Sequence, residues 1–265
     1  MKSLLYSIIN PVFSTVKNVS IDIKDLRERQ KHPERLIPPR SLRRSGGTID
    51  GYIVGGQGQA DRLIEYAGLK QSSHLLDVGC GDGRLASALA EFLKDGTYQS
   101  FEVQKQLVDF LSRHSTKKYP NFCFVHADLW HSYYNPTGKY KTTDYIFPYA
   151  DDSFDVVFLN SIFSHFAPNE IEHYLNEIHR VLKNEGAVLA TYFIANPESI
   201  AMDSRGLSAA TLRGALPKLL NFSFENYWTR DDSFKERLVV VDETWLTKSY
   251  QASNLEVTKI VYGTW

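Results

Sequence analysis

The stretch Leu75-Leu76-Asp77-Val78-Gly79-Cys80-Gly81-Asp82-Gly83 joins an apolar run to a helix expected to begin at Arg84. Glycines in such a turn permit positive φ angles and let the backbone approach a ligand closely, and the helix offers free N–H groups at its start. A turn of this kind is typical of sites that bind a nucleoside cofactor. Its spacing, G-x-G-x-G with an acid two residues before the first glycine, differs from the G-x-G-x-x-G of dinucleotide-binding proteins.

Apolar and amphipathic segments alternate around this turn, from about residue 57 to residue 194. Strands are expected at residues 74–79, 98–103, 122–127, 154–160 and 187–194. Helices are expected at residues 59–66, 84–93, 104–112 and 170–182. The alternation predicts an α/β fold of the Rossmann-like, doubly wound kind, with a mostly parallel sheet between two layers of helices. Beyond residue 196 the pattern weakens to a strand at 236–241, a helix at 243–253 and a last strand at 256–262.

Two parts of the chain are expected: a helical and basic N-terminal extension or lid over residues 1–56, and one domain over residues 57–265. Residues 1–45 hold ten Lys and Arg and four acids, in a chain whose net charge is −1. Apolar residues at helical spacing between positions 4 and 16 favour a helix packed on the domain, the alternative being an amphipathic segment on a membrane surface. The polar segment 20–45 is typical of a linker or flap.

Acids end the next two expected strands. Glu102 ends the second strand, where a carboxylate can accept hydrogen bonds from both hydroxyls of a ribose. Asp128 follows the third strand and can accept a hydrogen bond from an adenine amino group. Each acid alone is typical of a surface or capping position. Because the carboxyl ends of parallel strands meet at one edge of a sheet, the three acids Asp77, Glu102 and Asp128 together favour an adenosine-containing ligand.

The segment from about 70 to 194 resembles the class I S-adenosylmethionine-dependent methyltransferases, in the broad group called methyltransferase type 11. The resemblance is carried by Asp77, Gly79, Gly81, Glu102, Asp128 with Leu129, the run 147–155 and the run 177–186. It implies S-adenosyl-L-methionine as cofactor and S-adenosyl-L-homocysteine as product. The residues implied to bind the cofactor are Asp77, Gly79, Gly81, Glu102, Asp128, Leu129 and Asn160. It also implies a sixth strand and an antiparallel seventh strand at the end of the sheet.

The junction after the fourth strand, Asn160-Ser161-Ile162-Phe163-Ser164-His165, faces the transferred methyl group in the family that the chain resembles. It lacks the proline pair of DNA adenine methyltransferases, which argues against base methylation. His165 is the candidate general base, because a hydroxyl acceptor loses its proton near the transition state and an imidazole titrates in the useful range. The alternative is a helix-start residue packed on the loop. Ser161 and Ser164 are expected to contact the acceptor.

Other segments are expected near the ligands. Tyr52, in a glycine-rich segment before the first helix of the domain, is a candidate lid over the cofactor, with an ordinary turn as the alternative. Arg43 and Arg44 of the extension are candidates for binding the acceptor, as is Tyr145 of the Tyr- and Lys-rich insertion 130–149. That insertion leaves the carboxyl end of a strand, where ligands bind in such sheets. We expect the insertion and the region 197–254 to form the acceptor side.

Composition sets the remaining expectations. No apolar run approaches the roughly 18 residues of a membrane-spanning helix, and the two cysteines, Cys80 and Cys123, are placed as in a reducing compartment. A cytoplasmic protein is therefore expected, with peripheral membrane contact through residues 1–16 as an alternative. The near-neutral charge favours a small-molecule acceptor as partner rather than nucleic acid. No metal is expected, and the sequence leaves the oligomeric state open.

The activity expected is methyl transfer from S-adenosylmethionine to a hydroxyl of a sugar, a lipid-linked compound or a secondary metabolite. Two alternatives stay open. An NAD-dependent oxidoreductase or epimerase would use a Tyr-x-x-x-Lys pair, a spacing that Tyr66 and Lys70 have, although they precede the first strand with Gly68 between them. The other alternative is a protein that binds S-adenosylmethionine without turning it over.

Overall fold

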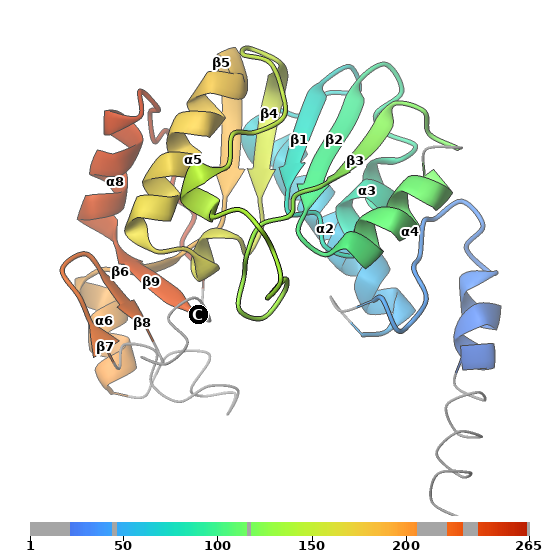
Figure 1. The fold of residues 1–265 in the computed structure, drawn as a ribbon, viewed down its shortest axis with the longest axis horizontal. Helices are drawn as coiled ribbons and strands as arrows, with labels where there is room; N and C mark the ends of the chain where they lie inside the picture. Colours follow the sequence, from blue (N-terminus) through green and yellow to red (C-terminus); the bar gives the residue numbers. More distant parts are fainter. Residues whose placement is uncertain (1–21, 44–46, 116–117, 206–221, 230–237, 264–265) are drawn as a thin grey trace, which may run out of the picture.

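The computed structural model describes residues 22–43, 47–115, 118–205, 222–229 and 238–263. Its central sheet has five parallel strands in the order β3-β2-β1-β4-β5 (Figure 1). The strands are β1 His74–Val78, β2 Thr97–Glu102, β3 Phe122–His126, β4 Phe154–Leu159 and β5 Leu182–Ala190. The helices that connect or flank them are α2 Ile49–Ala67, α3 Arg84–Leu89, α4 Lys105–Ser115 and α5 Pro168–Val181, with short 3-10 turns η1 Thr142–Asp144 and η2 Phe163–His165. The Rossmann-like fold predicted from the sequence is confirmed.

Side chains that alternate along the strands build a separate core on each face of the sheet. Leu75 and Val156 belong to the cluster packed with α2, α3 and α4. Their neighbours Leu76 and Val157 belong to the cluster packed with α5 and the later helix α8, Glu243–Ala252. Because both faces of a parallel strand are covered, the strands are apolar throughout rather than at every second residue.

The chain beyond β5 forms a second sheet instead of extending the first. This sheet has the order β6-β9-β8-β7 and consists of β6 Phe193–Ala195, β7 Phe222–Ser223, β8 Tyr227–Thr229 and β9 Val239–Asp242, with helix α6 Pro197–Ser204 beside it. The expected helix at 243–253 matches α8. The expected last strand at 256–262 is wrong, because after α8 Asn254 adopts a φ of 56° and residues 258–263 run exposed over the surface without strand pairing.

Helix α2 begins ten residues earlier than the apolar pattern predicts, because its first half is rich in glycine. A boundary between residues 56 and 57 would therefore cut this helix. Gly56 lies where α2 meets α3, and a Cβ built on it would stand 2.3 Å from the Arg84 carbonyl oxygen. The close approach of the two helices that this glycine permits outweighs its low helix propensity.

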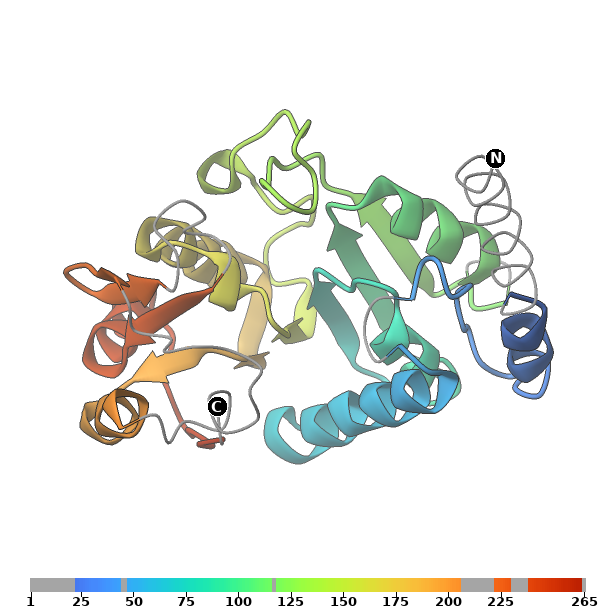
Figure 2. The same cartoon turned by 90° about the horizontal axis from the view of Figure 1, so that it is seen from below.

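Figure 2 shows α2 and the insertion after β3 on opposite sides of the strand ends.

The described part of the N-terminal extension is packed against the α2–α3 side of the domain. Its residues 22–29 are helical, and Leu36 lies buried with its N–H donated to Ser87 Oγ at 3.1 Å. The Arg43 guanidinium is buried and pairs with Asp25 at 2.5 Å while it also donates to the Pro38 carbonyl at 2.9 Å. Residues 1–21, which include the apolar pattern at 4–16, lie outside the described residues. Within the described ranges, no helix combines the length and apolarity needed to cross a bilayer.

Two glycines of α2 give a matched test of the close helix contact. Gly56→Ala should lower the free energy of unfolding by about 1–3 kcal/mol, because the new methyl group overlaps the backbone of α3. Gly58→Ala should raise it by up to about 1 kcal/mol, because only the movable end of Arg62 lies within reach, at 3.6 Å, and Ala favours the helix. Urea unfolding followed by circular dichroism measures both. Equal effects of the two substitutions would contradict the packing argument.

Candidate functional site

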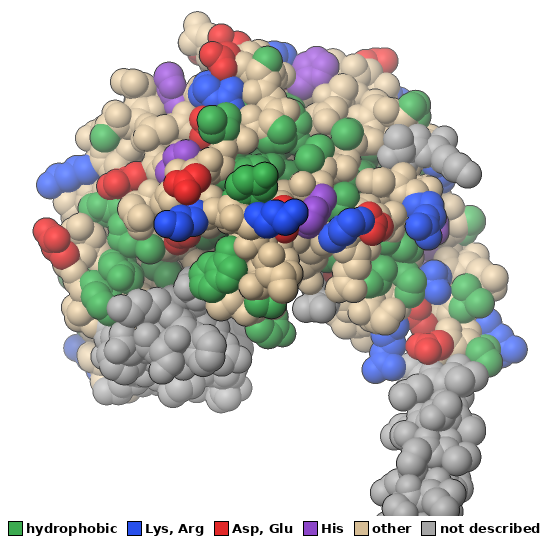
Figure 3. All heavy atoms as spheres, in the orientation of Figure 1, with side chains coloured by type: hydrophobic (Ala, Val, Ile, Leu, Met, Phe, Trp, Pro, Cys, Tyr) green, Lys and Arg blue, Asp and Glu red, His purple; other side chains and the backbone are tan. Residues whose placement is uncertain are grey.

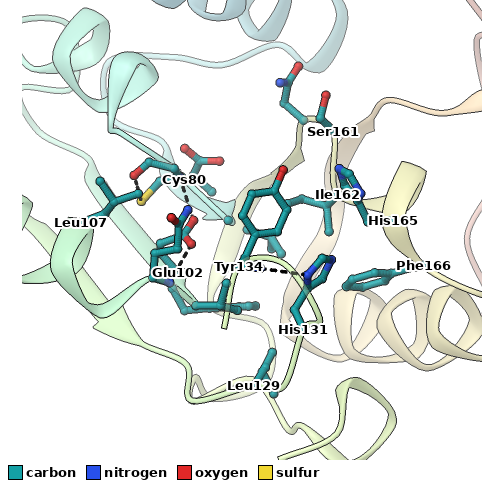
Figure 4. A pocket seen from close by; sticks show the side chains of 18 of the residues that line it. Cys80, Glu102, Leu107, Leu129, His131, Tyr134, Ser161, Ile162, His165 and Phe166 are labelled. Atoms are coloured by element: carbon teal, nitrogen blue, oxygen red, sulfur yellow. Dashed lines mark hydrogen bonds between the residues drawn. The ribbon is translucent and has the colours of Figure 1, made fainter. Parts of the chain in front are cut away.

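A cavity of about 390 Å³ opens at the carboxyl ends of β1, β2 and β4 (Figure 4). On one side it is lined by the loop after β1, by the end of β2 and by α2; on the other by the insertion and by the segment that follows β4. The predicted site residues that line it are Asp77, Gly79, Gly81, Glu102, Leu129, Asn160, Ser161 and His165. The structure therefore brings most of the predicted residues together at one edge of the sheet.

The loop after β1 has the backbone conformation that its glycines permit. Gly79, Gly81 and Gly83 have φ angles of 73°, 55° and 79°, values that other residues rarely adopt. A Cβ on Gly79 would also meet the Ile162 side chain at 2.4 Å, so the loop touches the segment after β4. The loop is thus held within van der Waals reach of the opposite wall.

Two buried carboxyl groups stand beside this loop. Glu102 accepts hydrogen bonds from the Gly81 N–H and the Gln104 N–H, each at 2.9 Å. A carboxylate has about four lone-pair positions, so Glu102 keeps capacity for further donors such as ribose hydroxyls. Asp77 accepts a hydrogen bond from the Tyr98 hydroxyl, which itself is fully buried. The charge of this wall is predominantly negative.

Burial governs the protonation of these acids. Desolvation raises the pKa of Asp77 to about 7, a rise that the Tyr98 hydrogen bond opposes and the nearby Glu102 charge increases. Desolvation also raises the pKa of Glu102, although the backbone N–H groups of Gln104 and Gly81 oppose it. Bringing a cation into the cavity would favour the ionised forms of both groups. The site is therefore suited to a positively charged ligand.

A polar cluster that sequence reasoning missed lies on the same side. With its amide oxygen turned toward them, Gln59 accepts hydrogen bonds from Arg84 Nη2 at 3.0 Å and from Asn160 Nδ2 at 3.2 Å. Arg84 is thereby fixed at the start of α3 while it lines the cavity. Its place directly after the glycine loop was the available signal in the sequence. A guanidinium here can bind a carboxylate.

The opposite wall carries two of the predicted residues, Ser161 and His165. Ser161 has a φ of 59° and donates its N–H to Thr191 Oγ1 at 2.8 Å. A positive φ in a residue other than glycine is uncommon and costs conformational energy. His165 ends the turn η2, is partly buried and lines the cavity. Ser164 is buried at 7% exposure and does not line it, so this structure gives no support to the predicted acceptor contact of Ser164.

The insertion lies at the cavity, as expected from the sequence, and contributes aromatic side chains to its lining: Trp130, His131, Tyr133 and Tyr134. Figure 4 shows the Tyr134 ring between the Glu102 side and the His165 side. Figure 3 shows hydrophobic side chains among Lys, Arg and His side chains on the face that carries the insertion. Tyr145, the insertion residue predicted for acceptor binding, instead packs on Phe101 with ring centroids 5.3 Å apart and lies outside the lining.

Other predicted residues lie behind the site. Tyr52 is not a lid, because its side chain is completely buried. Its hydroxyl donates to the Leu36 and Asp82 carbonyls at 2.8 and 3.2 Å and so supports the glycine loop from the side away from the cavity. The Arg43 guanidinium is buried in an ion pair with Asp25, so it cannot reach an acceptor. Arg44 lies outside the described residues. The expectation that Arg43 of the extension binds the acceptor is therefore wrong.

Asp128 and the region 197–254 also lie off the cavity. The Asp128 carboxylate accepts from Asn135 Nδ2 at 3.2 Å and stands 3.7 Å from Lys139 Nζ, so it holds the insertion in place. It does not line the cavity, although its neighbour Leu129 does, and an adenine contact stays a prediction. No described residue of 197–254 lines the cavity either. This region reaches the site only indirectly: the Tyr250 hydroxyl of α8 is 2.9 Å from the Tyr192 hydroxyl, and the Tyr192 ring stacks on Phe163 of η2 with centroids 4.9 Å apart.

The two motif runs before β4 and β5 form a clamp rather than a ligand site. Glu177 accepts the Phe147 N–H at 2.7 Å, and Arg180 donates to the Phe147 and Tyr149 carbonyls at 3.0 and 2.9 Å. Burial would raise the pKa of Glu177, but hydrogen bonds from Arg180 and Phe147 outweigh burial and lower it. The pair therefore stays ionised and fixes the end of the insertion on α5.

The pair that would serve an oxidoreductase is far from this arrangement. Tyr66 is in the last turn of α2, and Gly68 caps that helix with a φ of 63°, so Lys70 lies beyond the helix. Neither side chain lines the cavity, and Tyr66 instead faces the Lys259 ammonium at 4.6 Å from its ring centroid. The structure gives no support to that alternative.

Comparison with known proteins places residues 75–186 within a family model described as "Methyltransferase domain". Among solved structures, the PH0226 protein from Pyrococcus horikoshii OT3 is 16% identical with a TM-score of 0.53, covering 77% of this chain and 82% of its own. A putative methyltransferase from Bacillus halodurans C-125 is 21% identical, with a TM-score of 0.47 and coverage of 74% and 68%. The YcgJ protein from Bacillus subtilis is 19% identical, with a TM-score of 0.46 and coverage of 76% and 68%. At these identities a structural likeness speaks for the fold alone.

The raised pKa of Asp77 predicts a pH dependence of stability that Asp77→Asn removes. The folded pKa of about 7 lies above the ordinary value of 3.8, so this group's contribution is fully present below pH 3.8 and is lost as the pH rises through about 7. The loss is on the order of 4 kcal/mol. Denaturant unfolding from pH 4 to pH 8 should show the variant gaining stability relative to the wild type as the pH rises. A difference that stays constant over this range would contradict the raised pKa.

Proposed function

We propose that this chain is a class I S-adenosylmethionine-dependent methyltransferase and that it methylates a hydroxyl group of a small-molecule acceptor. Its cofactor is S-adenosyl-L-methionine. One observation carries the proposal: a single cavity joins the wall of buried acids around Glu102 to the wall that presents His165. Two reactants held in one cavity react as a pair already in position, which removes much of the entropic cost of meeting.

The residues of the first wall fit the cofactor. Its sulfonium and ammonium groups suit the negative charge of Asp77 and Glu102, and its carboxylate suits Arg84, which Gln59 and Asn160 hold in place. Glu102 has acceptor capacity for the ribose hydroxyls. An apolar slot for the adenine is lined by Phe101, Val103, Leu107 and Leu129. We propose that Asp128, adjacent to Leu129, accepts from the adenine amino group.

When bound, the cofactor supplies a methyl group on a positively charged sulfur. His165 accepts the proton of the acceptor hydroxyl as its oxygen attacks, so that no alkoxide has to form free in the cavity. Ser161, at the exposed mouth of the same wall, has its hydroxyl available to orient the acceptor. The buried acids contribute to cofactor binding, because their negative charge favours a cation in the cavity.

The support behind His165 keeps its ring in a fixed position. Phe163, in the same turn, is buried between the second sheet and α5 and stacks on Tyr192, whose hydroxyl is 2.9 Å from that of Tyr250 in α8. The His165 ring contacts the rings of Tyr134 and His131 on its other side, at centroid distances of 5.7 and 5.8 Å. A base held on both sides loses little freedom when the acceptor binds.

We also propose that the reaction takes place in the cytoplasm. Both cysteines are free thiols, Cys80 buried in the glycine loop and Cys123 exposed on β3. A thiol in such a loop stays in its free form most readily in a reducing compartment, where disulfides do not persist. Burial, with the nearby Asp77 and Glu102 charges, raises the pKa of the Cys80 thiol, which keeps it protonated and unreactive.

The role of Glu102 predicts a selective loss of cofactor affinity. Glu102→Gln should raise the Kd for S-adenosylhomocysteine by about 10- to 100-fold, because hydrogen bonds to a charged acceptor are replaced by weaker ones. Isothermal titration calorimetry measures this change. The control is Glu65→Gln, an exposed residue of α2, which should leave the Kd within twofold. An unchanged Kd for the Glu102 variant would exclude the proposed ribose contact.

The role of His165 predicts a loss of turnover without a loss of cofactor binding. His165→Gln should lower kcat by about 10²-fold or more, because glutamine cannot take the proton of the acceptor. The Kd for S-adenosylhomocysteine should stay within twofold. The matched control is His179→Gln, on the exposed side of α5, which should leave kcat unaltered. Full turnover of the His165 variant at saturating acceptor would rule out its role as the base.

A further inference from the structure

The acceptor side of the cavity is built from aromatic rings. We define the aromatic wall as Trp130, His131, Tyr133, Tyr134, His165 and Phe166, all of which line the cavity. These rings meet edge to face: Tyr133 and Tyr134 have centroids 5.0 Å apart at 84°, and Tyr134 and His165 have centroids 5.7 Å apart at 89°. Figure 4 shows His131 and Phe166 on the same side as His165, with the Tyr134 ring in the middle of the view. Flat apolar faces are therefore the main surface that this side offers to an acceptor.

His131 organises the loop that carries the two tyrosines. It exchanges backbone hydrogen bonds with Asn135 at 3.0 and 3.1 Å, and its Nδ1 accepts the N–H groups of Tyr133 and Tyr134 at 3.1 and 3.2 Å. Because Nδ1 accepts two hydrogen bonds, the ring proton is on Nε2 and the ring is neutral. Gly138 completes the loop, since a Cβ there would overlap the Leu129 carbonyl oxygen at 2.2 Å. The wall is thus a built surface with a defined shape.

Charge separates the two sides of the cavity. The described lining contains Asp77, Asp82, Glu102 and Arg84, and all four belong to the glycine-loop side. The aromatic wall contains no carboxylate, Lys or Arg. A cationic acceptor would find no carboxylate partner on this wall, and a sugar would find few groups for its many hydroxyls. A flat neutral ring matches the aromatic wall, because stacked and edge-to-face contacts between aromatic rings add binding free energy beyond that of the buried area.

The chemistry of a histidine base points the same way. A phenol ionises near pH 10, as tyrosine does, within about four units of imidazole, whereas the hydroxyl of water ionises near 15.7. In the step, an electron pair of the phenolic oxygen forms the new O–C bond to the methyl group, and the C–S bond breaks with its pair left on sulfur. The phenolic proton passes to His165 and from there to water. Charge and atoms balance without a further reactant.

We propose that the aromatic wall binds a planar aromatic ring and that the methylated hydroxyl is phenolic. The inference rests on the proposed function and narrows its acceptor to one chemical class. Trp130 and Tyr133 are 47% and 68% exposed at the mouth of the cavity, where they can contact the part of a fused ring system that extends outward. Tyr134 lies deeper, next to His165, and is the ring expected to contact the reacting phenol most closely.

Binding to the intact chain loaded with S-adenosylhomocysteine tests the ring directly. The probes are 2-naphthol and decahydro-2-naphthol, which share a carbon skeleton and a hydroxyl but differ in planarity, with methyl α-D-glucopyranoside and tetramethylammonium as other classes. Calorimetry should show 2-naphthol binding at least tenfold more tightly than each of the other three. Equal affinity for the flat and the saturated alcohol, or tighter binding of the glucoside or the ammonium ion, would overturn the inference.

Variants locate the binding on the wall. Tyr134→Ala should weaken 2-naphthol binding at least tenfold and leave the Kd for S-adenosylhomocysteine within twofold, while Tyr134→Phe retains 2-naphthol affinity because the ring is kept. Tyr140→Ala is the matched control: this tyrosine is 57% exposed on the same insertion and does not line the cavity. His131→Phe should also weaken 2-naphthol, since it keeps a ring but loses the Nδ1 acceptor. Equal losses in the Tyr134→Ala and Tyr140→Ala variants would overturn the inference.

Transfer of labelled methyl separates this inference from the function on which it rests. Label appearing on 2-naphthol supports both. Label appearing on the glucoside but not on 2-naphthol leaves the proposed methyl transfer standing and overturns the aromatic acceptor. A chain that fails to bind S-adenosylhomocysteine, measured by calorimetry before any acceptor is added, overturns both.

Discussion

The parallel pairing of β1 with β2 on one side and with β4 on the other is the constraint on which the site depends. Because the three strands run in the same direction, the residues that follow them emerge at one edge of the sheet. There the Gly81 N–H binds the Glu102 carboxylate at 2.9 Å and ties the loop after β1 to the end of β2. Gly79 then meets Ile162, which closes the contact with the segment after β4. The position of the cavity therefore follows from the strand order and not from any single side chain.

Buried charge gives this edge its chemical character. Asp77 and Glu102 are removed from water without a Lys or Arg in an ion pair with either among the described residues, so burial raises the pKa of both. A cation entering the cavity offsets that desolvation and favours ionised carboxylates. We therefore expect cofactor binding to release protons from this wall, whereas the aromatic wall opposite contains no Asp, Glu, Lys or Arg. Under the proposed function, the two walls would separate recognition of a charged cofactor from recognition of an apolar acceptor.

Parts of the chain distant from the site hold these walls in position. The Arg43–Asp25 ion pair fixes the N-terminal segment behind the glycine loop, where the Tyr52 hydroxyl reaches the Asp82 carbonyl. On the other side, the second sheet and α8 support η2 through Tyr192 and Tyr250. This second sheet takes the place of the sixth and seventh strands that the family resemblance implied, so the central sheet ends at β5 among the described residues.

The sequence by itself determined the order of strands and helices from residue 74 to 190, since apolar periodicity and glycine spacing are local properties. It also predicted that Asp77, Glu102 and His165 lie at one edge of the sheet, because residues at strand ends converge in any parallel sheet. Tertiary structure alone decided the roles of Tyr52 and Arg43, whose burial depends on partners 16 to 30 and 18 residues away. It alone revealed the aromatic wall, because the positions of rings on an insertion depend on backbone contacts such as those of His131, which no periodicity encodes. Local pattern specifies elements, and long-range packing specifies which side chains face the ligand.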